Sequence, residues 1–253
     1  MRAALAYGSR PAGLGDAYSD VEFWAFVDDA ALDGWSAGEW IARVAGPPSL
    51  LVQNEFGAWV AIYADLVRVE VHFWPASGVD VVSGWAARGA AVADMVVVDR
   101  DGRLEAALGS LPMTAPTPAT SESVAELCGR FANWWVLGRN VLSRGELERA
   151  QDALSHVRRF LLWMARVHEG ATDRWLTPSR LAEQDLSDEV RAALGETFVR
   201  TDSDALAAAY ANAWALGDEL WRALSEAWDF RLPELLEVMH NGTRGGLSTG
   251  PDA

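Results

Sequence analysis

The chain has 253 residues, half of them apolar, and a formal net charge of −15. Because nucleic-acid binding rests largely on Lys and Arg side chains that neutralise phosphates, this charge argues against a general nucleic-acid partner. The acidic surface suits either cationic small molecules or plain solubility, and composition alone leaves both open. No apolar run reaches the roughly 18–20 residues of a membrane span. The single cysteine, Cys128, excludes an internal disulfide, so we expect a cytoplasmic protein without a membrane partner.

The first half of the chain is predicted to be a mixed α+β domain. A short apolar strand over residues 3–7 leads into the turn Gly8-Ser9, and the Gly- and Pro-containing stretch up to Tyr18 is a loop. Ser36 and Glu39 form a capping-box pattern inside a helical segment over 30–45. Further strands are expected over 19–28, 49–53, 57–64, 66–73 and 92–99, with a short helix or loop over 79–92 and a helical turn over 104–109.

The second half is predicted to be all helical. Residues 111–121 hold three prolines and no charge, which is typical of a linker. Beyond them the apolar period changes from two to 3.6 residues, which indicates helices over 121–142, 145–168, 187–198 and 202–228, with a shorter piece over 232–240. We therefore expect a domain over 1–112, a linker over 113–120, a helical substrate-binding domain over 121–240 and a disordered tail over 241–253.

Three carboxylates stand out in the first half. Asp20 and Glu22 share one face of the 19–28 strand, since residues two apart point the same way, while Val21, Phe23 and Ala25 are expected to point into the body. Glu70 lies on the polar face of the valine-rich 66–73 strand. If the two strands are neighbours, these three acids converge at one edge of a sheet. Adjacent carboxylates repel unless a cation lies between them, and Mg²⁺ takes such oxygen ligands together with substrate phosphates.

This constellation matches the requirements of nucleotidyl transfer. The turn Gly8-Ser9 lets backbone N–H groups approach a phosphate, and the start of a following helix would add its dipole. Mg²⁺ held by Asp20 and Glu22 would neutralise charge that develops on the triphosphate. Glu70 would accept the proton of the acceptor hydroxyl, bind a second metal ion, or do both.

The same spacing resembles the polymerase-β-type nucleotidyltransferase superfamily, whose signature is a Gly-Ser turn, a strand with two acids and a third acid on a later strand. A closer likeness is to the two-domain lincosamide nucleotidyltransferases. It lies in YGSRPAGLGDAYSDVEFWAFV, QNEFGAWVAIYADLVRVEVHFW and RGELERAQDALSHVRRFLLWMAR. The resemblance implies a polymerase-β-like N-terminal domain, Mg²⁺, ATP as co-substrate, AMP transfer to an antibiotic hydroxyl, and Glu70 as the candidate base. It also makes a homodimer an expectation.

Several other residues are weaker candidates. Ser19 is expected beside the nucleotide, and Asp16 as the former of an Asx-turn. His72 shares the face of Glu70 and would orient the acceptor or Glu70, or simply line the cleft. Arg144 and Glu146 lie at a break between helices, where they would either contact substrate or form a solvated helix start.

Three other functions remain open at this stage. The same fold can modify an aminoglycoside, or a protein target as in toxin–antitoxin nucleotidyltransferases, and both would need the same acids. A binding module that retains the scaffold without catalysis is the third, and the intact acids argue against it. Lincosamide adenylylation is the hypothesis that the resemblance favours.

Overall fold

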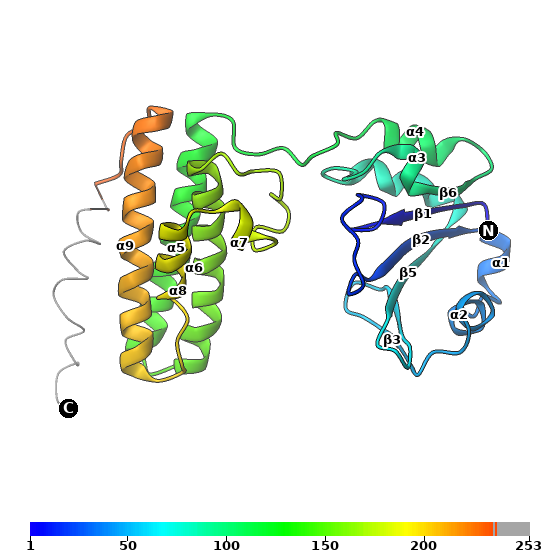
Figure 1. Cartoon of the computed structure of the whole chain (residues 1–253), viewed down its shortest axis with the longest axis horizontal. Helices are drawn as coiled ribbons and strands as arrows, with labels where there is room; N and C mark the ends of the chain where they lie inside the picture. Colours follow the sequence, from blue (N-terminus) through cyan, green and yellow to red (C-terminus); the bar gives the residue numbers. More distant parts are fainter. Residues whose placement is uncertain (235, 237–253) are drawn as a thin grey trace. The chain divides into compact units, whose positions relative to one another are not determined.

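The computed structural model describes residues 1–234 and residue 236. The chain divides into two compact units, Met1–Pro116 and Thr117–Ala253 (Figure 1). The first unit is built on a mixed sheet with helices and the second is helical, which confirms the predicted α+β class with a helical C-terminal half.

A six-stranded sheet in the order β3-β4-β5-β2-β1-β6 forms the centre of the first unit. The inner strands β2 and β5 run parallel, and every other neighbouring pair is antiparallel. The parallel pair is what makes the two acid-bearing strands neighbours. The strands are β1 (Ala3–Tyr7), β2 (Val21–Val27), β3 (Leu50–Gln53), β4 (Trp59–Ile62), β5 (Arg68–Pro75) and β6 (Val96–Asp99).

Both faces of the sheet are covered over part of their length. On one face Phe73 of β5 packs against Trp35 and Trp40, with ring centroids 5.5 and 5.3 Å apart. On the opposite face Phe26 of β2 is fully buried in a cluster that includes Leu104. The face of Val21, Phe23 and Ala25 points into the body as predicted at Ala25, and the opposite face does so as well, because Phe26 shares the face of Glu22.

The helical elements of the first unit differ from the prediction in two places. Residues 30–45 form two helices rather than one, with Ser36 accepting a hydrogen bond from the Glu39 N–H at 3.2 Å as the capping-box pattern predicted. Residues 92–95, expected as strand, form a helical turn that buries Met95. The helices are α1 (Asp29–Leu32), α2 (Ala37–Ala45), the 3₁₀ helix η1 (Ala76–Gly84), α3 (Val92–Met95) and α4 (Arg103–Gly109).

Three long helices make up most of the second unit and enclose its core. Trp135 donates a hydrogen bond to the Tyr210 carbonyl oxygen at 2.9 Å, and the Tyr210 hydroxyl donates to the Ala150 carbonyl oxygen at 2.7 Å. The long helices are thereby tied together through their buried faces. They are α5 (Ser121–Ser143), α6 (Leu147–His168) and α9 (Ser203–Trp228), joined by the short α7 (Ala182–Asp185) and α8 (Asp188–Gly195). The predicted tail over 241–253 lies outside the described residues, as does most of the predicted piece over 232–240.

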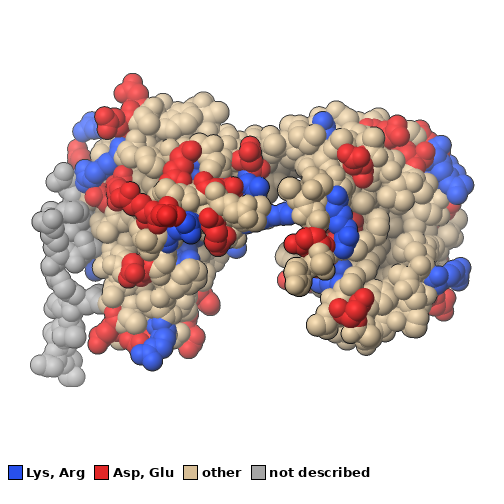
Figure 2. All heavy atoms as spheres, in the orientation of Figure 1, with Lys and Arg blue, Asp and Glu red and all other residues tan. Residues whose placement is uncertain are grey.

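The cysteine, the helices and the surface charge each bear on function. Cys128 is fully buried, and burial raises the pKa of its thiol to about 12, so it is a core residue. None of the helices in the described part of the chain is long and apolar enough to cross a membrane. Acidic side chains are spread over the visible face of each unit (Figure 2), in keeping with the net charge of −15.

Gly138 in α5 packs closely against Tyr210, so the helical core should not tolerate a larger residue at this position. A Cβ atom at this position would overlap the hydroxyl of Tyr210, which is held by its bond to Ala150. We expect Gly138→Ala to lower the free energy of unfolding by about 1–3 kcal/mol, as overpacking does. Gly129, in the same helix, has no atom within 4 Å of such a Cβ, so Gly129→Ala should raise it by up to about 1 kcal/mol through helix propensity. Denaturant unfolding followed by circular dichroism measures both, and equal effects would contradict the steric argument.

Candidate active site

The pairing of β2 with β5 brings the predicted carboxylates together. Glu22 lies directly opposite Glu70 in the parallel register, and Trp24 lies opposite His72. Asp20 lies just outside β2, because the strand begins at Val21 and not at residue 19 as predicted, but Arg68 pairs with both Asp20 and Glu70. Two strands that are far apart in sequence thus bring Glu22 and Glu70 together, and Asp20 lies close by at the start of one of them. The side chain of Glu70 is 14% exposed and that of Asp20 38% exposed.

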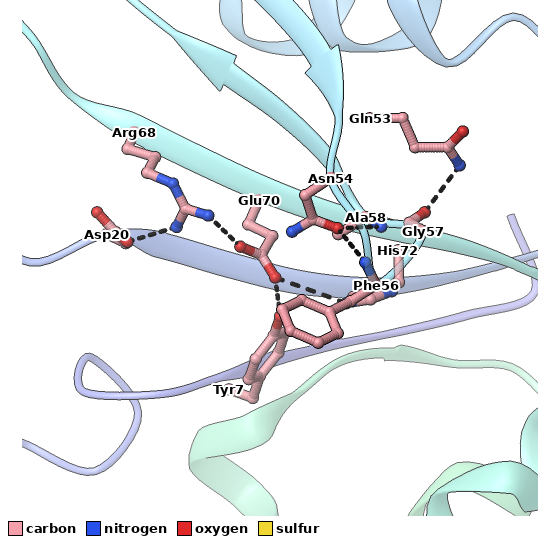
Figure 3. Close-up of polar contacts among 10 residues, drawn as sticks. All are labelled: Tyr7, Asp20, Gln53, Asn54, Phe56, Gly57, Ala58, Arg68, Glu70 and His72. Atoms are coloured by element: carbon pink, nitrogen blue, oxygen red, sulfur yellow. Dashed lines mark hydrogen bonds and ion pairs between the residues drawn. The ribbon is translucent and has the colours of Figure 1, made fainter. Parts of the chain in front are cut away.

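Arg68 provides the positive charge between these carboxylates. One guanidinium nitrogen lies 2.5 Å from Asp20 Oδ2, and the other pairs with Glu70 Oε2 (Figure 3). Burial alone would lower the pKa of Arg68, but its hydrogen bonds to Glu70 and Asp20 raise it, so the side chain remains a cation. The repulsion between neighbouring acids that the sequence predicts is therefore offset by a side chain from the same strand as Glu70.

Tyr7 and His72 contact the other oxygen of Glu70. The Tyr7 hydroxyl donates a hydrogen bond to Glu70 Oε1 at 3.1 Å, and His72 Nε2 lies 3.6 Å from the same oxygen (Figure 3). Burial first, and then the charge of Glu70, raise the pKa of Tyr7 well above its ordinary value, which keeps it a neutral donor. Both oxygens of Glu70 are thus held, one by Tyr7 and one by Arg68.

His72 lies between Glu70 and the aromatic side chains of Trp24 and Trp85. Its ring stacks on Trp24 with centroids 4.4 Å apart, and Trp24 also contacts Trp85 at 5.7 Å. Burial lowers the pKa of His72 despite the opposing charge of Glu70, so the imidazole is neutral near pH 7. The neutral imidazole of His72 therefore contacts the carboxylate site through Glu70 and the aromatic side chains through Trp24.

The Gly8 turn closes the site on the β1 side. Gly8 directly follows Tyr7, which pairs with Glu22 in the β1–β2 register, and it has a φ of +79°. A Cβ atom at Gly8 would overlap the Glu22 carboxylate, so a larger residue here would displace the end of that side chain. The helix that could follow the turn is absent, since residues 8–13 form turns instead, and no helix dipole is added here.

The loop between β1 and β2 is held by its own polar contacts. The Asp16 carboxylate accepts hydrogen bonds from the Tyr18 N–H at 2.9 Å and from the Ser19 hydroxyl at 2.8 Å, which confirms the predicted Asx-turn. Ser9 contributes its carbonyl oxygen, which accepts from the Leu14 N–H at 2.9 Å. The Ser19 hydroxyl, expected beside the nucleotide, is used within this loop.

The turn between β3 and β4 sets the position of the strand next to Glu70. Asn54 Oδ1 accepts hydrogen bonds from the N–H groups of Phe56 and Ala58 at 3.1 and 2.9 Å (Figure 3). With this turn in place, Val60 of β4 lies opposite Glu70 of β5. The turn leaves the Phe56 side chain 76% exposed.

Arg144 and Glu146 belong to the helical unit and form an exposed ion pair with a separation of 3.8 Å. Glu146 also pairs with Arg149 at 3.1 Å. These exposed ion pairs are compatible with both interpretations of the sequence, so substrate contact by Arg144 and Glu146 stays a prediction.

The donor atoms of the carboxylate site have the right chemistry for a hard divalent cation, because all three acids offer oxygen. Among the described residues, however, no group of three or more His, Cys, Asp or Glu side chains converges on a common point in the present arrangement. Asp20 and Glu70 are drawn to Arg68, and Glu22 lies against Gly8. Binding of a metal ion would therefore require Asp20 and Glu70 to break their ion pairs with Arg68.

Sequence reasoning missed two contributors to this site. The sequence indicates for Tyr7 only a place in an apolar strand, and for Arg68 only a place on the polar face of the strand that carries Glu70. Alternation along β5 indicates that Arg68 shares the face of Glu70, because the two residues are two positions apart. Nothing local signals Tyr7, since its contact with Glu70 spans 63 residues of sequence.

Comparison with known proteins finds one family model that matches the helical unit. Residues 120–241 match the model of the lincosamide nucleotidyltransferase-like C-terminal domain. The resemblance predicted from the sequence is thus confirmed, and with it the enzyme class of nucleotidyltransferase. No curated protein sequence matches the chain.

Two solved structures are similar over most of the chain. An aminoglycoside 6-adenyltransferase from Bacillus subtilis has 16% sequence identity and a TM-score of 0.48, with 97% of this chain and 92% of that one covered. A nucleotidyltransferase-like protein from Exiguobacterium sibiricum has 16% identity and a TM-score of 0.40, with coverage of 95% and 74%.

Proposed function

We propose that the chain is an adenylyltransferase that moves AMP from ATP to a hydroxyl of a small antibiotic, with a lincosamide as the preferred acceptor. The observation that carries the catalytic part is the register that sets Glu22 opposite Glu70, with Asp20 linked to Glu70 through Arg68 and the Gly8 turn alongside. The lincosamide part is supported by the family match over residues 120–241.

Glu70 is the residue proposed to move the proton. Its carboxylate is held in one orientation by Tyr7 and Arg68, which suits a base that must meet an acceptor hydroxyl at hydrogen-bond distance. As the acceptor oxygen bonds to the α-phosphorus, the O–H proton passes to Glu70 and the bond to pyrophosphate breaks. Pyrophosphate leaves with the electron pair of that bond.

Asp20, Glu22 and Glu70 are the residues that would hold Mg²⁺. When bound, the ion would neutralise negative charge on the triphosphate and on the leaving pyrophosphate. Arg68 holds two of the same carboxylates together when they are not engaged by another cation. The backbone of the Gly8-Ser9 turn is proposed to approach the phosphates, since glycine leaves that backbone uncovered.

The test is a product assay on the purified full chain. With MgATP and lincomycin or clindamycin we expect pyrophosphate release and an adenylylated antibiotic by mass spectrometry, and EDTA should abolish both. Aminoglycosides in the same panel serve as the competing acceptors. Turnover of an aminoglycoside alone would overturn the lincosamide assignment, and no turnover of any acceptor would overturn the antibiotic assignment as a whole.

A further inference from the structure

The helical unit contains a polar cavity that the proposed reaction does not use. It has a volume of about 410 Å³ and lies between one face of α6 and residues 176–179. Helix α6 contributes Arg158, Arg159 and Trp163, and the facing segment contributes the hydroxyls of Thr177 and Ser179. A neighbouring cavity of about 280 Å³ shares Arg158 and Ser179 with it. Together they fall in the size range of small-molecule sites.

The wall of the cavity opposite α6 is fixed in place by a buried arginine. Arg166 of α6 is fully buried and donates hydrogen bonds to the carbonyl oxygens of Pro178, Ala171 and Arg180 at 2.7, 2.8 and 2.8 Å. It also pairs with Asp185 at 2.9 Å. The segment that carries Thr177 and Ser179 is therefore attached to α6 at several points, and the cavity is preformed.

Arg158 is a partly buried cation whose charge no acid balances. One of its nitrogens donates to the Leu194 carbonyl oxygen at 2.9 Å and to the Thr197 hydroxyl. The Arg158 Cζ atom lies 3.2 Å from the centroid of the Phe198 ring. Within the described part of the chain it forms no ion pair with a carboxylate. Burial lowers its pKa, which reflects the cost of removing this charge from water.

Arg159 adds a second uncompensated charge at the same cavity. Its side chain is exposed and makes no ion pair with any described acid. Arg158 and Arg159 are adjacent in α6, so the cavity has two positive charges with no acidic partner among the described residues. Glu183 is the one acid among the described lining residues, and it belongs to the smaller cavity.

We propose that this cavity binds a phosphate-type oxyanion. Guanidinium groups present N–H donors in a planar fork that matches phosphate oxygens, and hydroxyls add further donors. Arg158 is held with one nitrogen engaged by protein and stacked on Phe198, so its orientation is set before a ligand arrives. The oxyanion comes either free, as phosphate or pyrophosphate, or as part of a phosphorylated organic molecule whose apolar part packs on Trp163 and Leu176.

The experiment is calorimetric titration of the full chain with pyrophosphate, orthophosphate and ATP in EDTA, which removes metal-dependent binding at the carboxylate site. We expect pyrophosphate to bind the wild type and Arg159→Gln to weaken it at least about tenfold, as loss of a charge-assisted contact does. Arg130→Gln, which removes an exposed arginine from α5 with the same change in charge, should bind as the wild type does. Tighter binding of ATP than of pyrophosphate would assign the oxyanion to an organic phosphate, and the reverse to the free ion.

Hydrogen exchange locates the binding. Amides in the segment 171–180 should exchange more slowly with pyrophosphate present, and this protection should be lost in Arg159→Gln. Arg158→Gln is a second variant, accepted only if its thermal unfolding matches the wild type, and Arg159→Lys should retain part of the affinity. Absence of pyrophosphate binding, or equal weakening by Arg159→Gln and Arg130→Gln, would overturn the proposal. Neither result bears on the adenylyl transfer proposed for the other unit.

Discussion

Replacing Glu70 by Gln is expected to lower kcat for adenylyl transfer by roughly 10²–10⁴-fold, the range for loss of a general base. Gln keeps the size of the side chain and can still accept from the Tyr7 hydroxyl, but it cannot take a proton or pair with Arg68 as a charge. The measurement is the steady-state rate of pyrophosphate release with saturating ATP and acceptor. Glu55→Gln, at an exposed turn position between β3 and β4, is the control and should retain the wild-type rate.

Asp20→Asn extends this test to the residue proposed to hold the cation. We expect a loss of similar size in kcat, together with a rise in the Mg²⁺ concentration needed for half-maximal rate, because one charged oxygen ligand is lost. Glu70→Gln with full activity would refute the base assignment alone. Asp20→Asn with unchanged activity and unchanged Mg²⁺ dependence would refute the carboxylate site as the site of reaction.

Gly8→Ala is expected to lower kcat/KM by about 10²-fold, the effect of moving a reacting group by roughly 1 Å. The added Cβ would overlap the Glu22 carboxylate, so either Glu22 or the turn has to move. The substitution should also cost about 1–2 kcal/mol of stability, since alanine is disfavoured at positive φ.

Gly13→Ala provides the matched control for that substitution. Gly13 has a φ of +72°, close to the +79° of Gly8, but nothing lies within 4 Å of a Cβ built on it. Its cost in stability should therefore resemble that of Gly8→Ala, while kcat/KM stays near the wild-type value. Equal loss of activity in the two variants would show that loop strain, and not the approach to Glu22, accounts for the effect.

The fold was predictable where the evidence in the sequence is local. The β2 and β5 strands, the capping pattern at Ser36 and the helices α5, α6 and α9 were all predicted from neighbours within a few positions, and the structure has each of them. The errors fall where local preference was overridden. Residues 92–95 have strand-like composition but form a helical turn that buries Met95 in the core shared with α4.

The sequence by itself singled out Asp20 and Glu22 as a pair, because a period of two would place them on one face of a strand. In the structure β2 begins at Val21, so Asp20 lies just before the strand. The sequence could not determine that β2 and β5 are parallel neighbours, since that pairing depends on contacts between residues almost 50 positions apart. The tertiary structure alone set Glu22 opposite Glu70, Arg68 between Glu70 and Asp20, and Tyr7 on the remaining oxygen of Glu70. Charge and hydrogen bonding in a folded protein follow from distance in space, and sequence patterns record only distance along the chain.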